Sequence, residues 1–511
     1  MLNAKRFKKH HCSDQGQLLP TYPSDLVPED HLARVVSEII DTLDLTELYQ
    51  KFSWEGGASF HPKAMVRTLF YGYSQGDRSS RRIQKQCQEN FVYLYLSSGL
   101  KPDFRTISEF RRKNLDLLKN MFNQIVQLCY QLGMIAIGKI SLDGTKIKAN
   151  AADRCLIDKD KLAAELVAIE QQITQILAEA EATDKQEDAA YGDTKTGDEL
   201  PKQLQHAQQR QQQINQLLAE LEREQANKLS TTDQDARFMK DHGRIRFCYN
   251  AQCATENQVI VAADVSNDED DRAQLIPMVA ELEQVATQLT GKTDYPLEHV
   301  KMITDAGYEL GKNLQHLDDR KIDGYVASQF ARVRAKERRG EIPPRPFNKD
   351  KFSYHPDGDY YECPAGQRLE YHRTTTVHGK TTTLTALYYK GTNCPSCAFQ
   401  NECATSKTGY RQITRYLEYD PYREKIDQKL QTAEGKALMR HRASDVEPVF
   451  GQLKQNIFRR SSFLLRGKHK VTGEFRLVCI AHNIKKIASH LKTANNDDNL
   501  AHIMNIKLKA A

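Results

Sequence analysis

Between residues 135 and 328 the sequence switches repeatedly between the two-residue period of a strand and the 3.6-residue period of a helix, and this constrains the fold most. Strand patterns occupy 135–149, 245–255, 258–265, 299–308 and 324–328, and helical patterns occupy 272–289 and 311–318. Three strands that are mainly adjacent are followed by alternating helices and strands. This order predicts an α/β layer architecture.

A heptad pattern interrupts the alternation after its first strand. One series of apolar residues is spaced by four and three residues, which is the a/d rhythm of a coiled coil: Leu162, Leu166, Ile169, Ile173 and Ile176. A second series follows a polar linker, with one polar interruption: Leu204, Ala207, Gln211, Ile214, Leu218 and Leu221. The two series predict an antiparallel helical hairpin over 155–226, inserted for a structural purpose.

Residues 1–134 carry apolar residues at helical spacing and predict a helical N-terminal domain. Thr106 and Glu109 fit a capping box, which predicts a helix from there past Leu128. Four cations crowd its expected first turns, namely Arg105, Arg111, Arg112 and Lys113. Because cations at that end oppose the helix dipole, we interpret them as DNA contacts of a DNA-binding domain.

Four of the eleven cysteines lie together in a segment of short strand-like pieces, 331–420. They are Cys363, Cys394, Cys397 and Cys403, with the spacing C-x30-C-x2-C-x5-C. Four thiolates suit tetrahedral zinc, and C-x2-C places two of them on one tight turn. The segment therefore predicts a small insert with one structural zinc ion, and four unpaired buried cysteines are the alternative. The other seven cysteines are scattered and are expected in the apolar core.

The charge of the chain is unevenly distributed. Lys and Arg number 73 against 67 Asp and Glu, and residues 447–511 alone hold 12 against 4. A run of cations without an intervening acid comprises Lys454, Arg459, Arg460, Arg466, Lys468 and Lys470. Such a run is either a solvated face or a surface that contacts nucleic-acid phosphates.

The distribution of apolar residues bears on whether the chain enters or crosses a membrane. No apolar run approaches the 18 residues of a membrane span, and the basic start MLNAKRFKKHHCSDQ lacks the apolar stretch of a secretory signal. We therefore expect a cytoplasmic protein without a membrane partner.

Three carboxylates are candidates for chemistry. Asp143 lies in an alternating strand before Gly-Thr, and Asp305 follows the strand pattern VKMIT, at the end where α/β sheets place ligand groups. Glu447 lies in SDVEPVFGQLKQNIF, beside a buried helical stripe. Each has a plainer interpretation: either Asp alone is more typical of a turn or cap, and Ser444 with Glu447 fits a capping box ahead of Pro448.

Taken together, the three carboxylates lie in blocks that resemble a known family. SLDGTKIKANA, ITDAGYELGKN and VEPVFGQLKQNIFRRSSFLLRGKHKVTGEFRLVCIAHNIKK resemble the catalytic blocks of bacterial insertion-sequence transposases of the DDE type. STTDQDARFMK and FCYNAQCATE are similar to the family's middle region. FHPKAMVRTLFYGYSQGDRSSRRI and KPDFRTISEFRR are similar to the helical domain that precedes its core.

The resemblance implies an RNase H-like catalytic core over 135–490, with the hairpin and the cysteine segment as inserts and 491–511 as a tail. Asp143, Asp305 and Glu447 would hold two Mg²⁺ or Mn²⁺ ions, and Lys454 would contact a DNA phosphate. Glu447 and Lys454 match the E-x6-K part of a signature of related transposases. Arg442 stands five residues before Glu447, one further than that signature prescribes, so no role is carried over to it.

The resemblance also implies function and partners. We expect a DNA transposase that cleaves and joins strands at the ends of an insertion sequence, binding double-stranded terminal inverted repeats and target DNA. A homodimer at synapsis and a place in the bacterial cytoplasm, at the nucleoid, follow from that. One alternative is an RNase H-like, metal-dependent nuclease that does not join strands. The other is a zinc-stabilised DNA-binding regulator without activity.

Overall fold

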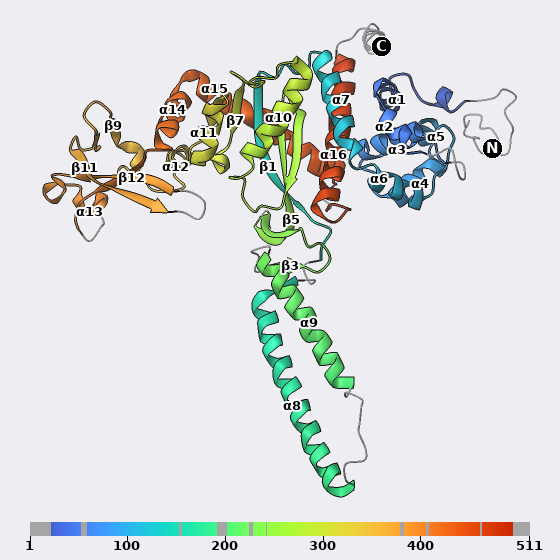
Figure 1. Cartoon of the computed structure of the whole chain (residues 1–511). Coiled ribbons are helices and arrows are strands. Elements are labelled where there is room, and N and C mark those ends of the chain that lie inside the picture. The colour runs from blue at the N-terminus through green and yellow to red at the C-terminus, as the bar shows by residue number, and fades with distance from the viewer. Residues whose placement is uncertain are drawn as a thin grey trace, which may run out of the picture. The chain divides into compact units, whose positions relative to one another are not determined.

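The structure is a computed structural model of the chain. It describes residues 22–52, 59–152, 156–191, 202–223, 228–241, 243–378, 383–404, 408–459 and 462–493. The chain divides into two compact units: one comprises residues 1–128 and 477–511, and the other comprises 129–476 (Figure 1). Arg460 and the tail from 494 onward lie outside the described residues. No helix in the described part of the chain is both long and apolar enough to cross a membrane.

The first unit is helical. It contains η1 (Pro23–Leu26), α1 (Leu32–Thr42), α2 (Thr46–Gln50), α3 (Pro62–Ser74), α4 (Ser80–Glu89), α5 (Phe91–Leu96), α6 (Phe104–Lys113), most of α7 (Leu117–Gln131) and the later part of α16 (Lys468–Thr493). Ile39, Phe70, Ile83 and Phe122 are fully buried in it. The helical periodicity therefore marks residues that form a real core.

The helix predicted from Thr106 past Leu128 is wrong in its boundaries. Asp103 caps α6 instead, because its carboxylate accepts the backbone N–H groups of Arg105 and Thr106 at 2.7 and 2.9 Å. The chain then leaves the helix after Lys113 and starts α7 at Leu117. Arg111 and Arg112 consequently lie in the last turn of α6, where cations favour the helix dipole.

Arg111 is also buried, with 6% of its surface exposed. Its Nη1 donates to the Tyr73 hydroxyl at 2.9 Å and to the Arg78 carbonyl at 3.0 Å. The expected DNA contact by Arg111 is therefore wrong: its guanidinium joins α6 to the preceding helices.

A six-stranded sheet is the centre of the second unit. Its strands are β1 (Lys139–Lys148), β4 (Arg237–Asp241), β5 (Arg244–Glu256), β6 (Val259–Ser266), β7 (Lys301–Thr304) and β8 (Asp323–Val326). β5 pairs antiparallel with β1 on one side and with β4 and β6 on the other. β7 runs parallel to β1, and β8 runs parallel to β7. The order from edge to edge is therefore β6 (with β4), β5, β1, β7, β8.

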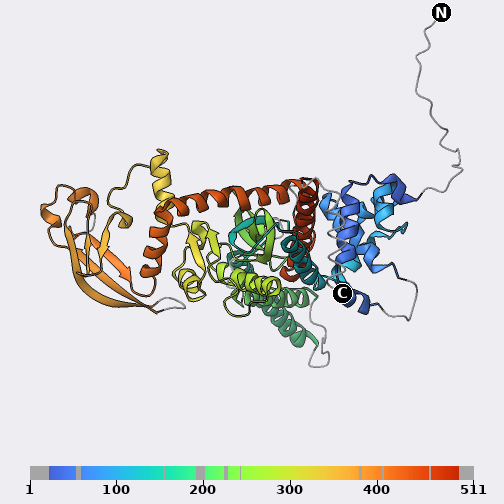
Figure 2. The ribbon, with the colours of Figure 1, turned by 90° about the horizontal axis from the view of Figure 1, so that it is seen from above.

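Helices cover this sheet. α10 (Leu275–Thr290) packs on β5 and β6, whereas α15 (Ala433–Gln452) packs across β1, β5, β7 and β8. Figure 2 shows these two helices on opposite faces of the sheet. α11 (Gly311–Asp319) contacts β8 and α14 (Asp420–Gln431). The expected α/β architecture is confirmed in this coarse sense, since helices and sheet form packed layers.

The start of β1 is held by one buried carboxylate. Glu256, at the end of β5, accepts four consecutive backbone N–H groups from Ala136 to Lys139, at 2.7 to 3.2 Å. Because one carboxylate provides the hydrogen-bond partners of four successive backbone N–H groups, the contact fixes where β1 begins. It thereby helps to set the register that carries Asp143.

The heptad residues form the interface of a helix pair. α8 (Lys159–Tyr191) and α9 (Lys202–Arg223) lie side by side, and a short ladder between β2 (Leu156–Asp158) and β3 (Lys228–Ser230) lies at the base of the pair (Figure 1). The buried residues at this interface include Leu162, Ile169, Ala207, Ile214 and Leu221. Leu166, Ile173 and Leu218 pack against them. Eight of the eleven predicted a/d residues therefore belong to this packed cluster.

The cysteine segment contains a second sheet. Five antiparallel strands follow the order β13 (Gln412–Tyr416), β12 (Thr383–Gly391), β11 (Arg368–His378), β10 (Tyr360–Glu362) and β9 (Ser353–His355). Its small core contains Phe352, Tyr361, Leu369, Tyr389 and Ile413. α12 (Gln329–Arg338), η3 (Lys349–Lys351), η4 (Cys394–Ser396) and α13 (Gln400–Cys403) complete the segment, and α14 leads from it back to the central sheet.

Candidate active site

Asp143 and Asp305 lie next to each other because of the strand register. β1 and β7 are parallel, and Leu142 is the partner of Thr304. Asp143 and Asp305 are the next residues along the two strands. Asp305 directly follows β7 and caps the short helix η2 (Ala306–Tyr308), since its Oδ1 accepts the Gly307 N–H at 2.8 Å. The predicted position of Asp305 after a strand is therefore what the structure shows.

Glu447 lies inside α15, not at a helix start. The N-cap of α15 is Thr432, fifteen residues earlier, and Pro448 is in the helix interior. Pro448 has no N–H, so it cannot donate a hydrogen bond to the Ser444 carbonyl one turn earlier. Gln258 Nε2 donates to that carbonyl instead, at 3.0 Å. The capping-box interpretation of Glu447 is therefore wrong, and its carboxylate is not needed to cap a helix.

Arg442 joins the carboxylates of Asp143 and Glu447. Its Nη1 lies 2.9 Å from Asp143 Oδ2, and its Nη2 lies 3.0 Å from Glu447 Oε1. The side chains of Arg442 and Asp143 are 14% and 18% exposed, whereas that of Glu447 is 53% exposed. The site is thus a buried carboxylate beside an open one, bridged by a cation. Sequence reasoning had assigned Arg442 no role.

Helix α15 is fixed on the sheet close to Glu447. The fully buried carboxylate of Asp445 accepts the Thr255 hydroxyl at 3.1 Å and the Gln258 backbone N–H at 2.5 Å. Val446 and Val449 are fully buried on the same helix. This packing sets the rotation of α15, and it directs Arg442 toward Asp143.

The electrostatics of Asp143 are unusual for a carboxylate. Burial, reinforced by the neighbouring charge of Asp305, raises the pKa of Asp143 to about 6, although Arg442 opposes the rise. A buried pair of carboxylates is costly unless a cation accompanies it. The site therefore needs positive charge, and the guanidinium of Arg442 supplies part of it.

These features fit a divalent cation. The available ligands are hard carboxylate oxygens, which suit Mg²⁺ or Mn²⁺, and a guanidinium occupies the space between two of them. Within the described ranges, however, no group of three His, Cys, Asp or Glu side chains is arranged so that it could hold a metal ion. The side-chain arrangement shown is that of Arg442 paired with the acids.

Sequence reasoning missed a polar network under this site. Asp271 Oδ1 accepts hydrogen bonds from Asn250 Nδ2 at 2.7 Å and Gln252 Nε2 at 2.8 Å, and it lies 3.5 Å from Lys146 Nζ. The Tyr308 hydroxyl donates to Gln252 Oε1. Burial and the charges of nearby aspartates, with Asp271 first among these, raise the pKa of Tyr308 well above its ordinary value.

The four cysteines of the 331–420 segment line one small cavity. Two backbone N–H groups point at sulfur, Gln367 N at 3.3 Å from Cys363 Sγ and Arg411 N at 3.4 Å from Cys394 Sγ. All four cysteines are free and partly exposed, so the alternative of four buried thiols is wrong. Of the other seven, the five described ones, Cys87, Cys129, Cys248, Cys253 and Cys479, are buried as expected.

The predicted DNA-binding cations have different environments. Lys454 lies in η5 (Leu453–Ile457), and burial lowers its pKa. Arg466 is exposed, and its Nε donates to the Asn150 carbonyl at 3.0 Å. Lys468 and Lys470, in the first turn of α16, are exposed, as are Arg459, Arg112 and Arg105. Phe458 and Phe463, interleaved with the basic run, are buried against each other.

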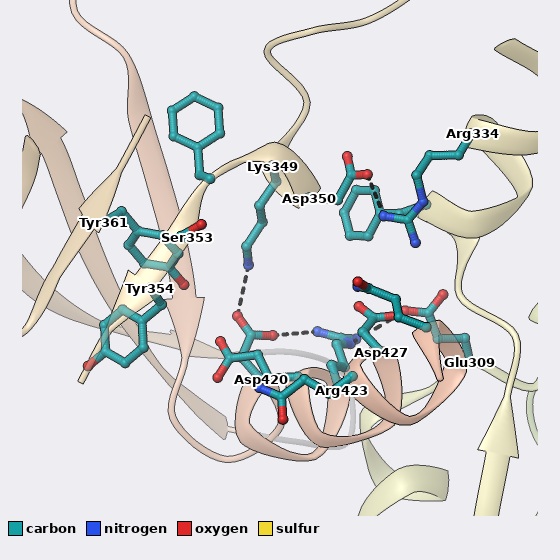
Figure 3. Close-up of a pocket in the computed structure, with 15 residues that line it drawn as sticks. Glu309, Arg334, Lys349, Asp350, Ser353, Tyr354, Tyr361, Asp420, Arg423 and Asp427 are labelled. Carbon is teal, nitrogen blue, oxygen red and sulfur yellow. Dashed lines mark hydrogen bonds and ion pairs between the residues drawn. The ribbon is translucent and has the colours of Figure 1, made fainter. Parts of the chain in front are cut away.

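A separate cavity of about 330 Å³ lies between α12, α14 and the second sheet (Figure 3). None of the three candidate carboxylates lines it. Its cations already have acidic partners: Lys349 and Arg423 each lie 2.8 Å from Asp420, and Arg334 lies 2.8 Å from Asp350. This pairing makes the cavity a poor site for phosphate chemistry.

Two family models match the chain. The model described as "Transposase DDE domain" matches residues 362–488, and the one described as "Transposase domain (DUF772)" matches residues 22–113. No curated protein and no solved structure matches. Both models describe transposases, and these matches support a DNA transposase. The match to the DDE domain supports, more narrowly, a DDE-type transposase of an insertion sequence.

The substrate and the metal requirement of DDE transposases bear on this site. DDE transposases act on DNA and use divalent metal, typically Mg²⁺ or Mn²⁺. The matched DDE segment includes Glu447, Arg442 and the four cysteines, whereas Asp143 and Asp305 lie before it. The assignment of those two aspartates therefore depends on the strand register and on the sequence blocks.

Proposed function

We propose that Asp143, Asp305 and Glu447 are the three acids of the DDE site, and that they support both cleavage and strand transfer at the ends of an insertion sequence. The observation that carries this is the position of Asp143 beside each of the other two acids. Asp143 is adjacent in register to Asp305, and it is joined to Glu447 through Arg442. Two divalent ions bound there would activate the attacking oxygen and stabilise the leaving one.

The fold that supports this proposal is RNase H-like. Antiparallel β6, β5 and β1 are followed by parallel β7 and β8, and the acids come from β1, the end of β7 and a helix packed on the sheet. Asp143 lies beside Asp305 in register and is joined to Glu447 through Arg442, so we assign to it the central position among the three acids. Glu447, which is half exposed, is placed to meet DNA from the solvent side.

Arg442 acts as a counter-ion in this proposal. Its guanidinium neutralises Asp143 and Glu447 when no metal is bound, and it must give up at least one of these contacts when cations take its place. Lys454, seven residues after Glu447, is proposed to contact a phosphate near the cut. Its lowered pKa, caused by burial, fits a lysine whose charge is not fully solvated.

The test uses a labelled duplex carrying one end of the element, with Mg²⁺ or Mn²⁺. Asp143→Asn, Asp305→Asn and Glu447→Gln should each reduce cleavage at least a hundredfold, because each amide removes a charge that holds a cation. Duplex binding should stay within about threefold of wild type. Glu434→Gln, on the same helix α15, is the matched control and should cleave normally. Wild-type cleavage by Glu447→Gln would remove Glu447 from the set.

The products of the same assay decide between a transposase and a nuclease. Joined products, with the element end covalently linked to target DNA, require strand transfer. Cleavage without any joining in the presence of target DNA would favour the alternative of a nuclease. A non-catalytic regulator would bind the duplex and give neither product.

The cysteine cluster is proposed to bind one structural zinc ion. The four sulfurs line one cavity, and two of them accept backbone N–H groups, as thiolate ligands of zinc do. Cys394 and Cys397 lie on one turn, where the Cys397 N–H donates to the Cys394 carbonyl at 3.1 Å. A zinc ion with four thiolates would have no position for water, so its role would be to hold the second sheet.

Each unit is proposed to contribute cations that contact DNA. These are Arg105 and Arg112 in the helical unit, and Arg459, Arg466, Lys468 and Lys470, with Arg460, in the other unit. The DNA would be the terminal repeats of the element and its target. A homodimer at synapsis and a cytoplasmic, nucleoid-associated location follow from that substrate and remain part of the proposal.

A further inference from the structure

The loop after β6 brings a fourth carboxylate to the site of the other three. β6 runs parallel to β1 and β7, so its C-terminal end lies at the edge of the sheet where Asp305 follows β7. Asp271 is five residues beyond the end of β6, and its side chain is 22% exposed. It is therefore placed at the edge that carries the proposed chemistry.

The two glycines that follow the catalytic aspartates show how close Asp271 lies. A Cβ on Gly144 would be 2.5 Å from Asp271 Oδ1 and 2.3 Å from the Gln252 amide nitrogen. A Cβ on Gly307 would be 2.9 Å from Asp305 Oδ1 and 3.5 Å from Asp271 Oδ2. Any side chain at these glycines would displace the carboxylates. The glycines in the Asp-Gly-Thr and Asp-Ala-Gly sequences thus make room for Asp271 and Asp305.

The two oxygens of Asp271 have different surroundings. Oδ1 is anchored by Asn250, Gln252 and Lys146, whereas Oδ2 would lie 3.5 Å from a Cβ on Gly307, the same Cβ that would lie 2.9 Å from Asp305 Oδ1. Metal-binding carboxylates are commonly held by hydrogen bonds to one oxygen, which leave the other oxygen able to bind the ion. The contacts of Asp271 follow this arrangement. The anchoring groups come from β5 and β1, which are rigid parts of the sheet.

We propose that Asp271 is a fourth carboxylate of the divalent-cation site and helps to hold the cation at Asp305. This rests on the proposed function, because it presumes that Asp305 is a metal ligand. Mg²⁺ and Mn²⁺ keep some of their waters when protein carboxylates bind them, so Asp271 Oδ2 contributes either to the cation or to one of its waters. Gln252 and Tyr308 are positioning residues for Asp271.

The test is Mn²⁺ binding by the full chain in the absence of DNA. Binding is measured as the loss of the electron paramagnetic resonance signal of free Mn²⁺. Asp271→Asn should raise the Kd for Mn²⁺ at least tenfold, because the amide keeps the shape and removes the charge. Glu269→Gln is the matched control: it removes a charge from the same loop at an exposed position and should leave the Kd unchanged. Asp305→Asn should raise the Kd as much as Asp271→Asn or more.

The outcomes separate this inference from the proposed function. Weaker binding by Asp305→Asn with normal binding by Asp271→Asn would overturn the inference and leave the three-acid site standing. Normal binding by both variants would overturn both proposals. The thermal midpoint of the metal-free Asp271→Asn protein should equal or exceed that of wild type, since one of several neighbouring negative charges is gone. A marked fall together with normal Mn²⁺ affinity would show a structural role and overturn the inference.

A second variant covers the case in which Asp271→Asn does not fold. Asp271→Glu keeps the negative charge beside Lys146 but moves the carboxylate by one methylene. It should fold and still show a Kd for Mn²⁺ several times that of wild type. An unchanged Kd in Asp271→Glu would contradict the inference, because the ligand geometry would not matter.

Discussion

Replacing Asp143 by asparagine should make the metal-free protein more stable at alkaline pH while it abolishes activity. Burial raises the pKa of Asp143 from 3.8 to about 6, with Asp305 adding to the rise and Arg442 opposing it. The folded state therefore binds a proton that the unfolded state has already lost between pH 4 and pH 6. Stability falls as pH rises through this window, and the whole loss is present above pH 6.

The magnitude follows from the pKa change. A rise from 3.8 to about 6 corresponds to roughly 3 kcal/mol at 1.36 kcal/mol per pH unit. Asparagine carries no charge at any pH, so the variant avoids this cost. For a cooperative unit of about 350 residues, 3 kcal/mol is a difference in Tm of about 4 °C. Asp143→Asn should thus melt up to about 4 °C above wild type at pH 8 and close to wild type at pH 4.

The assay is calorimetry at pH 4, 6 and 8 in buffer free of Mg²⁺ and Mn²⁺. A chelator is left out so that any zinc bound by the cysteines is retained. Adding Mn²⁺ at pH 8 should raise the Tm of wild type and leave that of Asp143→Asn unchanged, because binding to the folded state stabilises it. The control is Glu434→Gln, which removes an exposed acid paired with Lys301 and should show the same small effect at each pH.

Two results would refute the reasoning. If Asp143→Asn melted below wild type at pH 8, the charged carboxylate would be stabilising the fold. The stabilisation from its ion pair with Arg442 would then exceed the cost of burying its charge. If the variant gained the same stability at pH 4 and pH 8, the gain would not come from ionisation of Asp143. Either result would show Asp143 to be an ordinary structural aspartate.

Three further predictions concern the other parts of the site. Arg442→Gln should raise the pKa of Asp143 further, and the acid limb of the pH–rate profile for cleavage should move to higher pH; an unmoved limb would show that Arg442 does not act on Asp143. Cys397→Ser should lower zinc from about one per chain by elemental analysis and destabilise the second sheet, whereas full stability without zinc would contradict a structural ion. Replacing Lys468 and Lys470 by alanine should reduce the slope of log K against log salt for duplex binding by about 1.8, at about 0.9 per phosphate contact, and an unchanged slope would exclude them.

The sequence correctly predicted that Asp305 follows a strand, because the rule behind that prediction is local. A carboxylate directly after a short apolar strand lies at the C-terminal edge of the sheet, whatever the partner strands are. The heptads of α8 and α9 were predictable for the same reason, since each apolar series defines its own face. Patterns that need no knowledge of distant contacts were therefore reliable.

Helix boundaries were less predictable because a local signal can be overridden by packing. Ser444 and Glu447 have the spacing of a capping box, yet α15 passes through both of them. Val446 and Val449 bury their side chains only if the helix continues, and Gln258 satisfies the carbonyl that Pro448 leaves free. The contact from Gln258 joins residues 186 positions apart, so no local pattern contains it.

Dependence on distant contacts also explains why Asp271 was not predicted as a site residue. Like Asp305, Asp271 follows a strand and lies at the C-terminal edge of the sheet. The turn at Asn257 and Gln258 has positive φ at both residues, 53° and 63°, and this joins β5 and β6 as a tight antiparallel hairpin. β6 is then parallel to β1 only if β5 is antiparallel to β1, and the helical hairpin separates those two strands in the sequence. Without their relative direction, the acidic loop after β6 could lie at either edge of the sheet. Because the helical hairpin is inserted between β1 and β5, the sequence does not show that the acidic loop after β6 lies beside Asp143 and Asp305. One sign remained in the sequence: Asn250 and Gln252 are polar side chains in a buried strand, and such side chains need a polar or charged partner.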